Sequence, residues 1–379
     1  MAKLHKKGFF SLGIEEEFQI VDPKTKELRS HIEEVLSDGN IVLKESARRE
    51  MHQSVVETGT GICADIPAAR KEVTTLRTEL AKVAKARGFT IASAGTHPFS
   101  HWLDQEITDH ERYEGLVEEL GNVARKNLIF GLHVHVGFPD RNAAIQVINA
   151  ASYFVPHILA LSCNSPFWLG QDTDWSSYRV KVFESFPRTG LPQHFYSLGE
   201  YEEYVKLLVK LNCLDNPKKI WWDLRLHPTF DTIEFRMCDV QMRVDETIAL
   251  AALIQALVGT LYKLHQSNLT FRIYRRMMLD ENRFRAARFG TRGKLIDFAK
   301  QTEVPYEVLF EELAEFVADA VEEFGTQAEM DYLQKMVKEG NGATRQRKVF
   351  KETGSLEKVM EYIIQETHFG LGTEPPVMG

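Results

Sequence analysis

Charged side chains alternate along two segments that otherwise have the pattern of β-strands. Glu15 and Glu17 are separated by one residue, and so are Glu234 and Arg236. Successive side chains of a strand point to opposite faces, so each pair lies on one face of the sheet. Two carboxylates at this spacing repel each other, and a bound cation removes that repulsion. The spacing therefore predicts a cation site on the sheet surface.

Three further segments show the same feature. Glu57 lies within Val55–Thr58, His133 alternates with His135, and Asp223 alternates with Arg225. Glutamates with histidines and no cysteine form an oxygen-rich ligand set that suits Mg²⁺ or Mn²⁺ better than structural zinc. Mg²⁺ in such sites commonly bridges the protein to phosphates, which points to ATP chemistry.

Two simpler interpretations stay open at this point. Charged residues are usually exposed, so any single pair is also compatible with a solvated sheet face. A strand histidine is often a structural residue that hydrogen-bonds to the backbone. Agreement among five strands favours a binding site over a solvated face.

Two groups of basic residues are candidates for binding an anionic ligand. Arginines are concentrated from Arg272 to Arg292, and this group includes Arg288 and Arg292. Guanidinium groups match phosphate and carboxylate oxygens, but a solvated helix face with ion pairs explains the group equally well. Arg179 and Lys181, on a segment expected to alternate, are a second candidate pair for a substrate carboxylate.

Composition restricts the kind of partner and compartment. The chain has 379 residues and a formal net charge of −8, which argues against a general nucleic-acid or anionic-membrane surface. Its four cysteines form no CxxC pair, as expected for reduced thiols in the cytoplasm. The longest apolar segment, 248–264, is interrupted by Gln255 and Lys263 and is shorter than the ~20 residues of a membrane span. We expect small-molecule partners, with a homodimer permitted.

Hydrophobic periodicity predicts an α+β fold on a largely antiparallel sheet. Strands are expected at 9–21, 53–62, 89–96, 128–137, 220–226 and 231–238, and helices at 66–87, 109–121, 142–163, 200–212 and 244–266. The last two strands are close enough for a hairpin across 227–229. Without a flexible linker, residues 1–379 are expected to form a single catalytic domain, whose mostly helical part 270–379 packs on the sheet.

Familiar nucleotide-binding and hydrolase signatures do not explain the chain. It contains no GxxxxGK[ST] loop and no Gx[ST]xG elbow. Gly59–Ala64 matches the dinucleotide pattern GxGxxA, but repeated βαβ units are missing and Glu57 would lie beside the pyrophosphate. We interpret this match as a coincidence.

Four ordered motifs resemble the glutamate–cysteine ligase superfamily, most closely its bacterial carboxylate–amine ligase branch, glutamate–cysteine ligase type 2. They are Gly13–Glu17, Glu50 followed seven residues later by Glu57, Gly131–Gly137 and Thr232–Arg236. The resemblance extends from about residue 8 to about residue 370. It implies a glutamine-synthetase-like architecture, in which a curved, largely antiparallel sheet with helices packed around it holds Mg²⁺ and ATP.

The resemblance also implies roles for individual residues. The residues implied as metal ligands are Glu15, Glu17, Glu50, Glu57, His133 and Glu234. Arg236 is implied to contact the transferring phosphate and, with Glu57, to serve catalysis, while Arg179 holds a substrate carboxylate. His135 stands where the family often has asparagine and is assigned to the site lining. Lys181, Arg288 and Arg292 complete the expected set for substrate or ATP.

The implied reaction is ATP-dependent amide formation through an acyl phosphate. Its simplest substrates are the γ-carboxyl group of glutamate and the amine of cysteine, which give γ-glutamylcysteine, and activity on this pair is expected to be weak. Two alternatives remain: a metal-dependent hydrolase built on His133 and His135, and a nucleotide-binding protein without catalysis.

Overall fold

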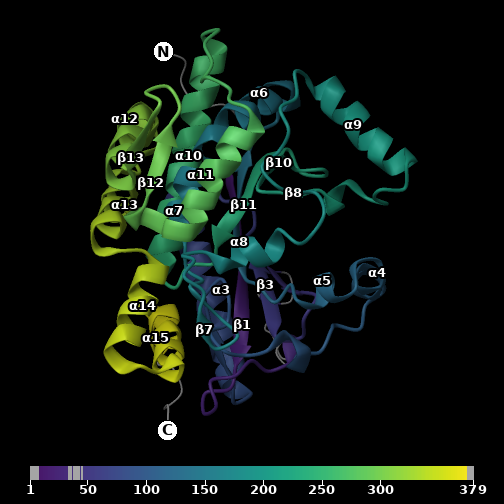
Figure 1. Ribbon diagram of the computed structural model, residues 1–379, viewed down its shortest axis with the longest axis vertical. Coiled ribbons are helices and arrows are strands. Elements are labelled where there is room, and N and C mark those ends of the chain that lie inside the picture. Colours follow the sequence, from purple (N-terminus) through teal and green to yellow (C-terminus); the bar gives the residue numbers. More distant parts are fainter. Residues whose placement is uncertain (1–7, 33–35, 37–42, 44–45, 374–379) are drawn as a thin grey trace.

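An antiparallel sheet forms the centre of the computed structural model, which describes residues 8–32, 36, 43 and 46–373 (Figure 1). Within this part, six of its seven strands run in the spatial order β10, β11, β5, β1, β3, β2, and β4 pairs with the far end of β1. Their bounds are β1 Leu12–Val21, β2 Ala47–Arg49, β3 Val55–Gly59, β4 Thr90–Ala92, β5 Gly131–Gly137, β10 Leu224–Leu226 and β11 Thr232–Asp239. The predicted α+β class is correct, and all pairs in this sheet are antiparallel.

The alternation along β1 determines which face of the sheet is covered. Leu12, Ile14 and Phe18 are buried under the helices, whereas Glu15 and Glu17 lie on the opposite face. Glu16 shares the covered face and is 2% exposed. Its carboxylate accepts hydrogen bonds from Nε (2.9 Å) and Nη2 (2.5 Å) of the fully buried Arg77 on α3 (Ile66–Ala86). Each charge therefore has a partner where water is excluded.

Helix α10 (Val244–Gln266) is the main core helix and packs against α6 (Arg141–Ala151), α3 and the sheet. This helix is long and apolar enough to cross a membrane, so the prediction that the apolar segment 248–264 is too short for a membrane span was wrong. Residues 141–162 are also long and apolar enough to cross a membrane. However, 83% and 89% of the two apolar windows are buried inside the protein, as in core helices. Both segments are thus explained by packing.

Local signals explain where several helices begin. Asp65 caps α3 by accepting a hydrogen bond from the backbone N–H of Ala68, and Pro67 fits the first turn. The helix expected over 142–163 is instead divided into α6, a 3₁₀ turn η2 (Ser152–Phe154) and α7 (Val155–Ser162). Pro156 lacks the N–H that a continuous helix would need, which accounts for the break.

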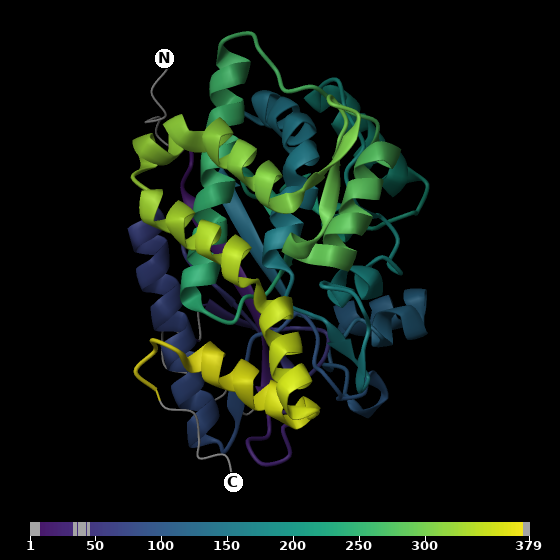
Figure 2. The same ribbon diagram turned by 60° about the vertical axis from the view of Figure 1, so that its left-hand side comes forward.

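The region after residue 270 is mostly helical, as predicted, and lies beside α10 (Figure 2). Its helices are α11 Arg276–Phe289, α12 Tyr306–Phe324, α13 Gln327–Glu339, α14 Gly342–Thr353 and α15 Leu356–His368. Helices α12 and α13 contact α10, α11 contacts α7, and α15 contacts β4. The prediction omitted the hairpin of β12 (Lys294–Asp297) and β13 (Thr302–Pro305).

The remaining elements connect the sheet strands and the main helices, and some of them border the open face of the sheet. They are η1 Trp102–Asp104, α4 Glu111–Leu120, α5 Asn122–Arg125, β6 Phe167–Trp168, β7 Gln171–Asp172, α8 Tyr178–Phe183, β8 Thr189–Gly190, α9 Leu198–Lys210, η3 Pro217–Lys219, β9 Trp221–Trp222 and η4 Gly290–Arg292. The strand expected over 220–226 is interrupted at Asp223, whose N–H donates to the carbonyl of Gly190 outside this sheet, while its carbonyl still accepts from Arg236 on β11. The segment with Arg179 is helical, so the expected alternation there was wrong.

Candidate active site

A polar cleft of about 590 Å³ lies on the open face of the sheet. Its floor carries Glu15, Glu17, Glu57, His133 and Glu234 from β1, β3, β5 and β11. One wall comes from β2 and α4, and the other comes from α8, η3 and β9. The sheet thus gathers residues that are more than 200 positions apart in the sequence.

Antiparallel register explains why these side chains meet. Glu17 pairs with Glu57, Glu15 with His133, and Glu234 with both His135 and Arg225. Three sets of residues could each hold a metal ion, because within each set the ligand atoms lie within 4.8 Å of one another. The sets are Glu15, Glu57 and His133; Glu15, His135 and Glu234; and Glu17, Glu50 and Glu57. The structure therefore brings together all six residues predicted as metal ligands, and His135 with them.

The carboxylates of Glu50 and Glu57 are held in an unfavourable environment. Burial and then the charge of Glu17 raise the pKa of Glu50 to about 7. Burial and the charges of Glu50, Glu15 and Glu17 raise the pKa of Glu57 well above its ordinary value. Both groups resist ionisation because they are buried and because like charges lie beside them. A divalent cation at this position would remove the repulsion.

Glu15 has the opposite balance. Burial acts to raise its pKa, but a hydrogen bond from His133 and the charges of His133 and His135 outweigh burial and hold the pKa below its usual range. The distances are 3.1 Å to His133 Nδ1 and 3.6 Å to His135 Nε2. His135 Nδ1 lies 3.1 Å from the hydroxyl of Thr232, whereas its Nε2 is buried without a hydrogen bond. This nitrogen is available to a ligand between Glu15 and Glu234.

Glu234 accepts hydrogen bonds from two arginines. Arg225 Nε donates to its carboxylate over 2.6 Å, and Arg236 Nη1 also donates to it. Burial acts to raise the pKa of Glu234, but the charges of Arg236 and Arg225 hold it well below its usual range. The side chain of Arg236 is largely buried, at 13% exposure, and its Nε has no hydrogen-bond partner. Because Arg236 lines the cleft, this N–H group is available to donate to an anion.

Arg179 reaches the cleft through a gap left by a glycine. Its Nη1 and Nη2 donate to the carbonyls of Met237 and Arg236, each over 3.3 Å. A Cβ at Gly131 would stand 2.3 Å from Nη2, so any other residue there would displace the guanidinium from its present position. Arg179 is 4% exposed and its Nε is buried without a partner. The predicted Arg179 and Arg236 therefore lie close together in one site.

Four predicted residues do not line the cleft. His135 lies beneath it, beside the floor residues Glu15 and Glu234, whereas the other three lie elsewhere. Lys181 pairs with Glu184 and lies over the ring of Trp175. Arg288 lies 3.9 Å from Asp174, and Arg292 donates to the carbonyl of Lys338. Elsewhere in the same arginine group, Arg283, Arg276 and Arg285 form ion pairs. The ion-paired helix face, left open from the sequence, describes this group better than an anion site.

The comparison of sequences identifies the family. Residues 11–362 match glutamate–cysteine ligase family 2 (GCS2). The chain belongs to glutamate–cysteine ligase family 2. A relative from Solibacter usitatus, provisionally named glutamate–cysteine ligase 2, is 54% identical over 95% of this chain and 94% of its own. A relative from Roseiflexus castenholzii with the same provisional name is 53% identical over 96% of both chains. The predicted family is confirmed, and the protein is a ligase.

Solved structures confirm the glutamine-synthetase-like fold expected of this ligase family. Glutamate–cysteine ligase from Francisella tularensis, solved in complex with AMP, has a TM-score of 0.73 at 13% identity, covering 98% of this chain and 91% of its own. A bifunctional glutathione synthetase from Pasteurella multocida has a TM-score of 0.70 at 15% identity. The match covers 96% of this chain and 53% of the Pasteurella chain.

Sequence reasoning on this family 2 ligase missed the walls of the cleft. They include Arg48, Arg49, Arg112, Tyr113, Asn127, Lys218, Lys219 and Trp221. Arg225 was noted for its alternation but was not assigned to the site. The wall residues come from β2, α4 and η3 and from the connections between elements, where no period marks a common face. These wall residues come near the floor residues of the cleft only in the folded structure, so the sequence pattern does not reveal them.

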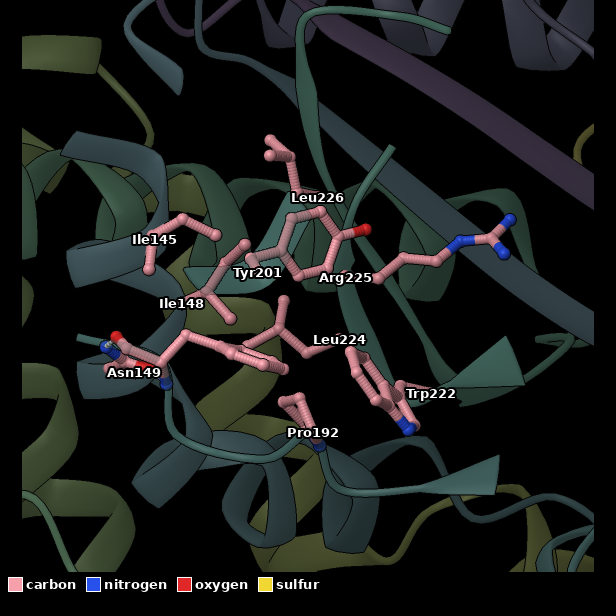
Figure 3. Close-up of a pocket in the computed structure, with 10 residues that line it drawn as sticks. Ile145, Ile148, Asn149, Pro192, Tyr201, Trp222, Leu224, Arg225 and Leu226 are labelled. Atoms are coloured by element: carbon pink, nitrogen blue, oxygen red, sulfur yellow. Dashed lines mark hydrogen bonds between the residues drawn. The ribbon is translucent and has the colours of Figure 1, made fainter. Parts of the chain in front are cut away.

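A second cavity, of about 10 Å³, lies next to Arg225 in the ligase but is apolar (Figure 3). Ile145, Ile148, Tyr201 and Leu224 are among the residues around it. The guanidinium group of Arg225 points away from these side chains (Figure 3). A volume of this size is close to that of a single water-sized probe, so we interpret the cavity as a packing gap.

Glu50→Gln should stabilise the metal-free ligase at alkaline pH. The folded pKa of Glu50, about 7, lies above its ordinary value of 4.5, so ionising it costs stability. This cost is complete above pH ~7 and disappears as the pH falls towards 4.5. We expect a gain on the order of 1 to 2 kcal/mol at pH 8, reduced by the partial exposure of Glu50. Urea unfolding of both proteins with chelator at pH 5 and pH 8 measures it, and an equal gain at both values would contradict this explanation.

Proposed function

We propose that the protein is an ATP-dependent carboxylate–amine ligase that forms an amide through an acyl phosphate. The carboxylate attacks the γ-phosphorus of ATP and ADP leaves. The amine then attacks the acyl carbon, and phosphate leaves. The γ-carboxyl group of glutamate and the amine of cysteine are the first pair to test. The observation that carries the proposal is the cleft itself, where an acidic floor lies beside two buried arginines with free N–H groups.

The donor set fits Mg²⁺, and Mn²⁺ fits by the same chemistry. The residues that would hold it are Glu15, Glu17, Glu50, Glu57, His133 and Glu234. The raised pKa values of Glu50 and Glu57 support this assignment, because burial and then the neighbouring glutamates oppose their ionisation, and a bound cation would favour it. When bound, Mg²⁺ supplies positive charge that neutralises the phosphate oxygens. His135 would line the same site with its free Nε2.

The arginines provide the remaining positive charge. We assign Arg236 to the transferring phosphoryl group, where its Nε–H donates to an equatorial oxygen as negative charge develops. We assign Arg179 to a carboxylate of the substrate, because a planar guanidinium matches two carboxylate oxygens. Both guanidinia are held by surrounding protein atoms, so little reorganisation is needed during the reaction. Catalysis in this scheme is mainly positioning and electrostatic stabilisation.

The two alternatives are less well supported. In a hydrolase based on His133 and His135, the histidines would be expected to converge on one metal. Here they fall in different groups, each with two glutamates. The family of ligases to which the chain belongs argues against a binding protein without catalysis. We further propose that the whole chain forms a single catalytic domain that acts in the cytoplasm, with homodimerisation still to be tested.

ADP release provides the direct test of the proposed reaction. ADP should form only when Mg²⁺, ATP, a carboxylate substrate and an amine are all present, with an amide product of matching mass. A screen of amino-acid carboxylates against amines, read by coupled ADP detection and mass spectrometry, measures this. ADP formation at the same rate without either substrate, or no ADP with any pair, would overturn the proposal.

A further inference from the structure

A buried carboxylate lies beneath the cleft and takes no part in the proposed reaction. Asp239 is the last residue of β11 and is 0% exposed. Three groups donate hydrogen bonds to it: the backbone N–H of Asn164 (2.7 Å), the hydroxyl of Ser165 (2.7 Å) and the hydroxyl of Ser177 (2.8 Å). A buried carboxylate with three donors is costly to assemble, so its position requires an explanation.

The donors to Asp239 connect it directly to Arg179. Ser177 immediately precedes α8, and its hydroxyl bonds to Asp239 instead of capping that helix. The hydroxyl of Ser165 accepts a hydrogen bond from the backbone N–H of Arg179 over 3.1 Å while it donates to Asp239. One carboxylate therefore fixes the first turn of α8 at two points, one on each side of Tyr178.

The electrostatic environment of Asp239 and the close packing around it also connect this residue to Arg179. Burial raises the pKa of Asp239, and the positive charge of Arg179 is the leading influence in the opposite direction. A Cβ at Gly95 would stand 2.7 Å from Cγ of Asp239, and a Cβ at Gly131 would stand 2.3 Å from Nη2 of Arg179. Two glycines thus leave room for the two charged groups. Asp239 and Arg179 each lie against a glycine, and both are connected to the first turn of α8.

We propose that Asp239 is a positioning residue, which holds Arg179 in the orientation that binds the substrate carboxylate. Arg179 has only two long hydrogen bonds to carbonyl oxygens on its guanidinium, so these alone do not fix its direction. The anchored first turn of α8 supplies the missing constraint. The role of Arg179 in binding a substrate carboxylate rests on the proposed function. The structural coupling between Asp239 and Arg179 does not depend on it.

Asp239→Asn tests the inference with almost no change in shape. The asparagine carries no charge, so the hydrogen bonds from Asn164 and Ser165 weaken, and the Ser177 hydroxyl stays bonded only by turning to accept from the NH₂ group. Both anchors of α8 are therefore weakened. We expect the KM for L-glutamate to rise roughly tenfold, the size of one charged hydrogen bond, with kcat changed less than about threefold. Arg179→Lys should raise KM similarly, and the double variant should be no worse than either single variant.

Glu246→Gln is the matched control. Glu246 is also buried, at 1% exposure, and bonds to Arg345, but it lies on α10 and does not line the cleft. It should lower the melting temperature and leave KM unchanged. If Asp239→Asn behaves in the same way, or if its effect adds fully to that of Arg179→Lys, the inference is overturned. Should Asp239→Asn not fold, Ser177→Ala removes a single donor and should raise KM by a smaller factor.

A spectroscopic measurement separates this inference from the proposed function. In protein labelled with ¹⁵N-arginine, the Nε–H signal that disappears in Arg179→Lys belongs to Arg179. Asp239→Asn should shift or broaden this signal without any ligand, and Glu246→Gln should not. An unchanged signal in Asp239→Asn overturns the positioning role. No ligation by the wild-type protein together with a changed signal overturns only the proposed function.

Discussion

Glu57→Gln should abolish ligation and at the same time make the metal-free protein more stable. Glu57 is 8% exposed and stands directly opposite Glu17 in the β1–β3 register, where two like charges repel. The amide has nearly the same shape and carries no charge, so the repulsion ends. Burial and the neighbouring carboxylates raise the pKa of Glu57, so its ionisation costs stability, and we expect a gain in unfolding free energy at pH 8 that disappears at acidic pH.

The loss of activity follows from the same carboxylate. Glu57 belongs to two of the three groups of possible metal ligands, so its removal weakens both. We expect kcat to fall by about 10³, which corresponds to roughly 4 kcal/mol of transition-state stabilisation. ADP release measures the loss of activity, and urea unfolding with chelator measures the gain in stability.

The control for Glu57→Gln is again Glu246→Gln, which should have the opposite effects. Removing the charge of Glu246 leaves Arg345 without its close partner, so stability should fall while activity persists. A Glu57→Gln protein that keeps its activity would remove Glu57 from the metal site. One that is less stable than wild type would show that repulsion does not dominate there.

Arg236→Met and Arg225→Met should separate catalysis from stability. Arg225 donates to Glu234 and to the carbonyls of Lys218 and Ile220, so it is built into the fold. Its removal breaks a buried network and should cost ~3 to 5 kcal/mol of unfolding free energy. Arg236 shares Glu234 with Arg225, so Glu234 keeps one partner when Arg236 is replaced. We expect a smaller loss of stability in that case.

Activity should show the reverse order for the two arginines. The free Nε–H of Arg236 is available to the phosphoryl group, and its loss should lower kcat by about 10²- to 10³-fold. Folded Arg225→Met, measured at low temperature, should retain more activity than Arg236→Met. Steady-state kinetics and urea unfolding on both proteins provide the comparison. Equal kcat values would contradict the assignment of Arg236 to phosphoryl transfer.

The floor of the site was predictable because a strand has a simple period. Alternation of Glu15 with Glu17 and of His133 with His135 specifies a face whatever the rest of the fold does. Family resemblance added Glu50, which β2 and the following turn bring beside Glu57. Burial, pairing and hydrogen bonding were not visible at that stage, so the two roles of Glu234 as acid and ion-pair partner were not foreseen.

The walls were not predictable for a physical reason. Residues such as Arg112 and Lys219 reach the cleft only because α4 and η3 are brought there by tertiary contacts. Lys181 was placed on an alternating segment, whereas the turn after Ser177 starts a helix and directs Lys181 to Glu184. The arginines of α11 were ambiguous because charge alone does not distinguish a ligand site from an ion-paired face.

The pairing of Glu16 with Arg77 has a consequence for how the chain finds its native alignment. A shift of β1 by one residue would bring Glu15 or Glu17 opposite Arg77 and turn the other one into the apolar layer without a partner. The unpaired buried charge would cost several kcal/mol, and Leu12, Ile14 and Phe18 would turn towards the open face. The same run of three glutamates thus supplies ligands of the site and penalises this misalignment of the strand.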